Sequence, residues 1–183
     1  MSRVRDLVRA YDEFISLPWQ EEMAASQRVT MCVYDEQDEL KLRAIKEEFG
    51  IVTSQAGHQW LEYDLTDAFP KWLMSTPHAK KSFAMPNLFT SLLHTFKNHI
   101  VEDFVSFSEK HKPGANHVVA LTGVGSLFGY LKVKDLLDDL APMVKGRLVV
   151  FFPGSYENNN YRLLDAYDGW NYLAVPITAD NKE

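Results

Sequence analysis

The chain has 183 residues, of which 46% are hydrophobic and 24% are charged, and this balance is typical of a soluble globular protein rather than a disordered or fibrous one. Its formal net charge of −6 argues against a general nucleic-acid or anionic-membrane surface, because such surfaces are built from clustered Lys and Arg. We therefore expect one domain, spanning residues 1–183, that binds neither nucleic acid nor membranes directly.

The N-terminal segment, residues 1–17, mixes both charge signs with apolar residues at helical spacing, which predicts an amphipathic helix and not a signal peptide. The longest apolar stretch, residues 118–131, is too short and too rich in glycine to cross a bilayer, which needs about 20 apolar residues. The single cysteine, Cys32, lies in the strand-like run "RVTMCVYD" and is interpreted as a small buried hydrophobic residue. These features predict a cytoplasmic protein.

Apolar runs and helical periodicities alternate along the rest of the chain. The predicted strands cover residues 29–34, 60–65, 117–122, 147–152 and 172–177. The predicted helices cover residues 35–50 with Gly50 as the stop, 86–112 before Pro113-Gly114, and 133–144. Residues 70–86, which contain three prolines, are expected to form an irregular connection.

This alternation predicts a three-layer α/β fold with about five mostly parallel strands and helices on both faces of the sheet. The strand at residues 147–152 is apolar almost throughout, which fits burial on both of its faces. Neither an internal repeat nor a linker composition suggests a second domain.

A glycine-rich run, "ALTGVGSLFGYLKVKD", follows the third strand and precedes a helix, where backbone N–H groups are able to approach a phosphate. This alternative cofactor site consists of Gly123, Gly125, Ser126 and Gly129, with Lys132 or Lys134 assisting. Its spacing matches neither the dinucleotide fingerprint nor the phosphate loop of ATPases. Acidic residues also follow the first strand, where such ATPases bind their phosphates. We interpret the glycines as turn and packing residues, so that the fold resembles an ATPase core without a functional nucleotide-binding loop.

Residue types for other chemistry lack the required spacing. The six histidines form neither an H-x-x-x-H nor an H-E-x-x-H pattern. Neither "GVGSLFG" nor "PGSYEN" provides the G-x-S-x-G turn of an acyl-transfer nucleophile. We expect no metal, no cofactor and no catalytic residues, so the protein is predicted not to be an enzyme.

Polar turn residues follow the fourth strand abruptly, at the carboxyl edge where α/β proteins meet ligands and partners. Gly154-Ser155 is expected to end that strand, and three asparagines then precede a group of aromatic residues. Tyr, Trp and Arg are over-represented at protein contacts, so we predict a partner-binding surface here. Its members are Tyr156, Asn158, Asn159, Tyr161, Arg162 and Trp170. The alternative is a loop that folds under its own aromatic residues.

Three segments together, "LPWQEEMAASQRVTMCVYDEQDELKLR", "GHQWLEYDLTD" and the chain from "VVALTGVGSLFGYLKVKD" to "YDGWNYLAVPITAD", resemble the BrxB family, a component of BREX bacteriophage-defence systems. The resemblance covers nearly the whole chain and is densest over residues 118–180. It implies a non-catalytic adaptor or scaffold in a system that methylates host DNA and blocks phage replication. The other components that it implies are a methyltransferase, a large ATPase and PglZ, a protein of the alkaline-phosphatase superfamily. PglZ is the expected direct partner, and nucleotide sensing or catalysis through the glycine loop is the alternative function.

Overall fold

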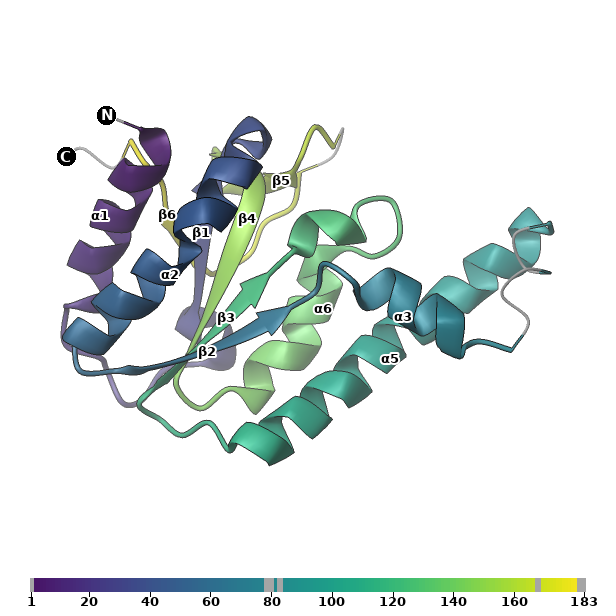
Figure 1. Cartoon of the computed structure of the whole chain (residues 1–183), viewed down its shortest axis with the longest axis horizontal. Coiled ribbons are helices and arrows are strands. Elements are labelled where there is room, and N and C mark those ends of the chain that lie inside the picture. Colours follow the sequence, from purple (N-terminus) through teal and green to yellow (C-terminus); the bar gives the residue numbers. More distant parts are fainter. Residues whose placement is uncertain (1, 78–80, 82–83, 167–168, 181–183) are drawn as a thin grey trace.

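The computed structural model describes residues 2–77, 81, 84–166 and 169–180 (Figure 1). The helices are α1 (Arg3–Ile15), α2 (Glu39–Gln55), α3 (Ala68–Ser75), α5 (Pro86–His111) and α6 (Val133–Leu140). The strands are β1 (Val29–Tyr34), β2 (Gln59–Asp64), β3 (His117–Thr122), β4 (Arg147–Glu157), β5 (Asn160–Leu163) and β6 (Val175–Ile177). Short 3-10 helices cover Ala25–Arg28, Glu36–Asp38, Val124–Leu127 and Ala141–Met143.

The strands form one sheet in the order β2-β3-β4-β1-β6, and every neighbouring pair in this order is parallel. β5 lies off this path and pairs antiparallel with the end of β4. In the central pair, Val29 of β1 faces Leu148 of β4 and Cys32 faces Phe151. The predicted α/β class with a mostly parallel sheet is therefore confirmed, with six strands instead of about five.

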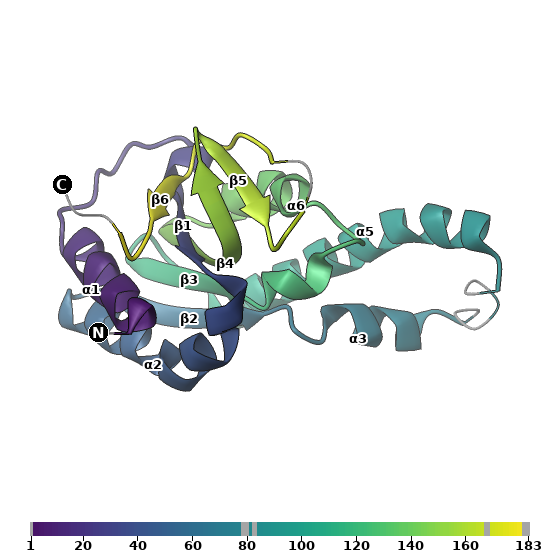
Figure 2. The same cartoon turned by 90° about the horizontal axis from the view of Figure 1, so that it is seen from above.

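Helices cover both faces of the sheet because the chain changes direction across it. The crossover from β1 to β2 runs toward one edge, and the crossovers from β2 to β3 and from β3 to β4 return toward the centre. Since crossovers between parallel strands are almost always right-handed, this reversal places α2 on one face and α5 and α6 on the other. Figure 2 shows this arrangement, with α1 beside α2.

The side chains of β4 alternate between the two layers of the core. Val149 and Phe151 pack with α1 and α2, whereas Leu148, Val150 and Phe152 pack with α5 and α6. All five are at most 1% exposed. The prediction that this strand is buried on both faces is confirmed, and it explains the nearly unbroken apolar run in its sequence.

The predicted N-terminal helix and the buried cysteine are also confirmed. The buried face of α1 contains the apolar residues Val4, Leu7, Val8, Tyr11 and Ile15. Cys32 lies in the same core layer and is fully buried, and this burial raises the pKa of its thiol. Cys32 is therefore a core residue and not a reactive thiol.

The predicted stop at Gly50 is wrong, because α2 continues to Gln55. Gly50 serves packing: a Cβ atom at this position would lie 3.2 Å from Cδ1 of the Trp60 indole in β2. Glycine lets the helix and the ring approach closely, and the loss of helix propensity at one position costs only about 1 kcal/mol.

The connection predicted as irregular over residues 70–86 is partly helical. α3 covers Ala68–Ser75 and contains Pro70 in its first turn, where the missing N–H group of proline has no intrahelical partner in any case. Residues 78–80 and 82–83 of this prediction lie outside the described residues. Figures 1 and 2 show α3 beside the N-terminal half of α5, and both extend away from the sheet. In the described ranges, no helix combines the length and apolar character that a membrane crossing requires.

Candidate interaction surface

A β-hairpin forms where the sequence suggested that the fourth strand ends. β4 continues through Gly154 and Ser155 to Glu157, and Glu157 pairs with Asn160 of β5. Asn158 and Asn159 make the two-residue turn with φ angles of 50° and 63°. Asparagine tolerates this left-handed region better than other residues with side chains, which explains why the chain places asparagines here. The prediction that Gly154-Ser155 ends the strand is wrong.

Side chains fix the geometry of this turn. The hydroxyl of Tyr156 donates a hydrogen bond to Oδ1 of Asn159 at 3.1 Å, and Nδ2 of Asn160 donates to the carbonyl oxygen of Asn158 at 3.2 Å. The turn therefore holds a fixed shape while Asn158 and Asn159 stay exposed. A fixed, exposed turn loses little conformational entropy when a partner binds it.

Tyr161 is a core residue of the hairpin, and its predicted role as a contact residue does not fit the structure. Its side chain is 0% exposed, and its hydroxyl donates to the carbonyl oxygen of Ala174 at 3.0 Å. Its ring lies 5.8 Å from that of Phe152 and 5.4 Å from that of Trp170. Burial raises the pKa of Tyr161, so the phenol stays protonated as this donor. For Tyr161 the alternative prediction, an aromatic residue packed beneath its own loop, is the one that fits.

The other predicted residues of β4, β5 and the bridge lie on two faces of the hairpin. Tyr156 and Trp170 are on the same face as Tyr161, against whose ring they pack, and Arg162 points to the opposite face. Arg162 is exposed, while Tyr156 and Trp170 are half-buried. Trp170 and Tyr161 exchange backbone hydrogen bonds of 2.8 Å and 2.9 Å, which makes Trp170 an extra rung beside β5. We call the surface of this hairpin, on both of its faces, the hairpin surface; it includes Tyr156, Asn158, Asn159, Arg162 and Trp170.

A groove with a volume of about 650 Å³ runs beside the hairpin surface. One wall consists of Leu163 and Trp170, and the other is the loop from Phe128 to the start of α6. Phe128 is 42% exposed and Tyr130 is 38% exposed. The glycines were the only residues of this loop with a predicted role apart from Ser126, Lys132 and Lys134, so Phe128 and Tyr130 were missed as contact residues. The signal that marks them is the run "SLFGY", in which two aromatic residues flank Gly129.

Two lysines, Lys132 and Lys134, also line this groove. Within the described part of the chain, neither forms an ion pair, although Asp135 lines the same groove. Exposed aromatic rings beside two unpaired ammonium groups suit a partner segment that presents apolar and acidic side chains.

The glycine loop itself is accounted for by local geometry. Gly123 has a φ angle of 72° and Gly129 one of 81°, whereas Gly125 is outside this left-handed region. The hydroxyl of Ser126 lies 2.8 Å from the carbonyl oxygen of Leu65 and 2.7 Å from that of Gly123. Ser126 therefore ties the loop to the end of β2, which is a structural task.

Polar side chains at the neighbouring carboxyl ends of the strands hydrogen-bond one another. Tyr34 donates to Glu39, and Nε of Arg43 donates to Oε1 of the same carboxylate at 2.7 Å. Nζ of Lys46 lies 2.6 Å from Oε1 of Glu62. Each of the two basic groups at this edge thus faces a carboxylate of the chain itself.

Asp64, at the end of β2, is likewise held by groups of the chain itself. Burial works to raise its pKa, but the hydrogen bonds from Thr66 and the nearby charge of Lys46 outweigh burial and hold the pKa below its usual range. The backbone N–H of Thr66 donates to Oδ1 of Asp64 at 2.8 Å and its hydroxyl at 2.6 Å. Asp64 thus acts as a turn-forming residue. In the region covered by the structure, no three His, Cys, Asp or Glu side chains gather as metal ligands would.

The fold and this edge together define an α/β protein with a mostly parallel sheet between two helical layers and an aromatic hairpin at the carboxyl ends of the strands. The chain belongs to the BrxB family: the family model described as "BREX protein BrxB" matches residues 66–177, more than half of its length. The match includes the glycine loop, the groove and the hairpin. Neither the curated proteins nor the solved structures contain a match to the chain. Membership in the family identifies the protein as a component of BREX phage defence.

Proposed function

We propose that the chain is a cytoplasmic, non-catalytic adaptor that binds another BREX component through the hairpin surface and the adjoining groove. The partner that we propose is PglZ, with the methyltransferase and the large ATPase as the other candidates. In this role the protein supports host DNA methylation and the restriction of phage.

The observation that carries the proposal is the groove beside the hairpin, with its exposed aromatic rings and two lysines that have no ion-pair partner among the described residues. Phe128, Tyr130 and Trp170 leave apolar surface accessible at one place, and such patches mark contact sites more often than chance. The adjoining turn of Asn158 and Asn159, held by side-chain hydrogen bonds, favours binding because it loses little conformational entropy on association. The groove and the hairpin also lie inside the residues that define the family.

The non-catalytic part of the proposal rests on the state of the groups that chemistry would need. Ser126 makes hydrogen bonds within its loop, and Arg43 and Lys46 face carboxylates of their own chain. Glu36, Glu39 and Arg43 line the small pocket beside Gly125, and Arg43 is paired with Glu39, so the remaining charge of Glu36 opposes a bound phosphate.

Titration with labelled ATP, GTP or NAD(P) is therefore expected to give no saturable binding to the purified protein. Fluorescence polarisation at micromolar protein concentration measures this, with an unlabelled nucleotide as competitor. Saturable binding that Ser126→Ala or Lys132→Ala weakens would instead support the nucleotide sensor based on Gly123, Gly125, Ser126 and Gly129.

The partner-binding proposal predicts that Arg162→Glu weakens binding to PglZ. A residue that anchors an interface contributes at least about 2 kcal/mol, which corresponds to roughly a thirtyfold change in Kd. Arg162 is exposed, so the folded state should tolerate the change. Interferometric titration against purified PglZ measures the affinity.

Lys110→Glu is the matched control, since it makes the same change of charge at an exposed residue near the end of α5. α5 runs antiparallel to β3, so its C-terminal end lies at the opposite end of the sheet from the hairpin (Figure 1). Equal affinities of the two variants for PglZ would contradict the proposed surface. Tyr161 is unsuitable for this test, because its replacement removes a buried ring from the core.

A further inference from the structure

The outer edge of β2 is open to pairing. β2 is the terminal strand of the sheet, and within the described residues it pairs only with β3. The N–H groups of Gln59 and Leu65 donate to the carbonyl oxygens of Asn116 and Thr122, so the odd-numbered residues face β3. The ladder alternates, and the backbone groups of Trp60, Glu62 and Asp64 therefore point to the open edge.

β2 lacks the proline, bulge and in-strand lysine by which many edge strands prevent pairing, although it carries the acidic residues Glu62 and Asp64. Gln59–Asp64 pairs with β3 in continuous register over six residues, without a proline, a glycine or a bulge. Proteins commonly protect such an edge with lysine, proline or a bulge, since an open strand is a template for another chain. An edge of this length without them is suited to strand addition.

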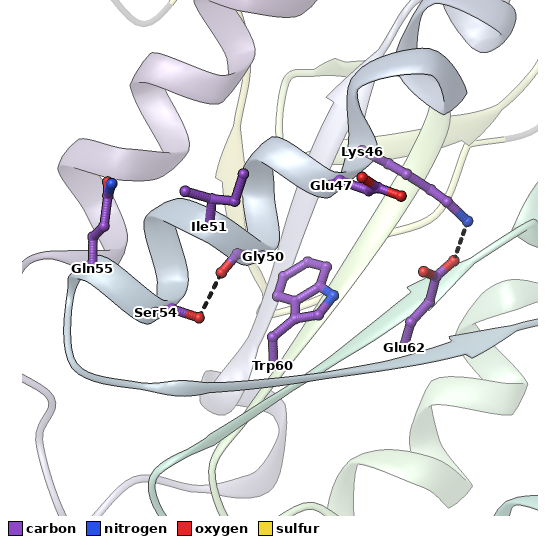
Figure 3. A pocket seen from close by; sticks show the side chains of 8 residues that line it. All are labelled: Lys46, Glu47, Gly50, Ile51, Ser54, Gln55, Trp60 and Glu62. Atoms are coloured by element: carbon purple, nitrogen blue, oxygen red, sulfur yellow. Dashed lines mark hydrogen bonds and ion pairs between the residues drawn. The ribbon is translucent and has the colours of Figure 1, made fainter.

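A pocket of about 540 Å³ lies directly beside this edge, between α2 and β2. Figure 3 shows Trp60 rising from β2 toward α2, with Ile51 above it and the ion pair of Lys46 and Glu62 closing one end. Ile51 is 55% exposed, and Gly50 makes room for the indole. A strand added to β2 would place alternate side chains on this face of the sheet, where the pocket accepts a large apolar group.

The charges at the edge select a basic segment. Glu47 lines the pocket, is exposed, and forms no ion pair within the described residues. Asp64 is exposed at the end of the strand. The net charge of −6 adds to this local preference. A Lys or Arg two positions from the apolar group would lie on the same face of the added strand and meet these carboxylates.

A second copy of the chain fits this edge poorly. Symmetric antiparallel pairing of β2 in the register that joins all three outward-facing residues, Trp60, Glu62 and Asp64, would set Glu62 opposite Glu62 of the other copy. Like charges at directly opposed positions destabilise a strand pair.

We propose that the open edge of β2 and the pocket beside Trp60 bind an extended segment of a partner protein that carries a large apolar residue and a Lys or Arg at alternate positions. The segment adds to the sheet as a further strand. This surface is separate from the hairpin surface and goes beyond the adaptor function proposed above.

A displayed library of random decapeptides, selected against the immobilised full chain, tests the proposal. Enriched sequences are expected to place a large apolar residue and a Lys or Arg two positions apart. A synthetic peptide with an enriched sequence is then titrated by fluorescence polarisation. Glu62→Pro removes an outward N–H group and blocks the edge, and it should weaken binding at least tenfold. Glu62→Gln loses the same charge but keeps that N–H group, so it is the matched control and should bind the peptide at least tenfold more tightly than Glu62→Pro does.

Ile51→Lys provides a second test through the pocket, and Arg162→Glu is the control at the hairpin surface. Ile51→Lys should also weaken the peptide at least tenfold, and Arg162→Glu should leave its affinity unchanged. Circular dichroism checks the fold, and if Glu62→Pro does not fold, the comparison of Ile51→Lys with wild type decides. Enriched peptides without the pattern, or equal binding to Ile51→Lys and wild type, would overturn the proposal. So would a sedimenting dimer that Ile51→Lys dissociates, since a second copy would then occupy the edge.

Discussion

Replacing Val150 with Asp is expected to lower the free energy of unfolding by several kcal/mol. Val150 is 0% exposed in the middle of β4, and it packs in the core layer beneath α5 and α6. A carboxylate at this position would be taken from water into an apolar interior without a partner. The whole stability of a domain is about 5–15 kcal/mol, so one such penalty removes a large part of it.

Val105→Asp makes the same chemical change at a surface position and serves as the control. Val105 is on α5 and is 38% exposed, so a carboxylate there keeps much of its hydration. We expect its urea midpoint by circular dichroism to stay near that of the wild type, while the midpoint of Val150→Asp falls well below it or its folded signal is lost. A folded Val150→Asp variant with the wild-type midpoint would show that β4 is not at the centre of the core.

The central strands were predictable because their composition and length favour a buried strand over a buried helix. A run such as "RLVVFF" is short, apolar on both faces and rich in β-branched and aromatic residues, as a strand between two layers requires. Val149 and Phe151 on one face and Val150 and Phe152 on the other confirm this directly. The ends of the helices and strands were harder to predict. Gly50, for example, resembles a helix stop in the sequence, but in the structure it lies inside α2 and packs against Trp60 of β2. No local pattern contains that contact.

The hairpin shows what composition reveals about a site and what it leaves out. Asparagines and aromatic residues after a buried strand indicated a turn with contact-type side chains, and the structure contains that turn. Composition does not separate the buried Tyr161 from the exposed Arg162 beside it, since both belong to residue types found at interfaces. Their separation depends on the alternation of β5, a strand whose pairing with β4 was not foreseen. Lys132 and Lys134 were considered only as phosphate ligands, because the sequence does not show that their loop lies beside the hairpin.

The glycine loop was located correctly, but the sequence does not say which glycine its shape requires. Three glycines occur in seven residues, and only Gly123 and Gly129 have positive φ angles. Gly125 has an ordinary conformation, and a Cβ atom there would lie 3.3 Å from Cγ of Pro153. The requirement at Gly123 comes from residues at the end of β2, far away in sequence.

Gly123→Ala is accordingly expected to destabilise the protein by at least about 2 kcal/mol. The φ angle of 72° costs an L-residue about 1–2 kcal/mol. The added Cβ atom would also lie 2.5 Å from the backbone nitrogen of Thr66 and 2.8 Å from Oδ1 of Asp64, so the end of β2 has to move. That movement would disturb the hydrogen bonds by which Thr66 holds Asp64.

Gly129→Ala separates the cost of the positive φ angle from the cost of the steric clash. Gly129 has a similar φ angle of 81°, but a Cβ atom at this position meets nothing within 4 Å. Its replacement should therefore cost only the conformational part, about 1–2 kcal/mol. Urea unfolding of both variants measures the difference, which reports the contact between the loop and the end of β2. If Gly123→Ala were no less stable than Gly129→Ala, this contact would be too loose to shape the loop, and the glycine at position 123 would need another explanation, such as the approach of a ligand to the backbone of the loop.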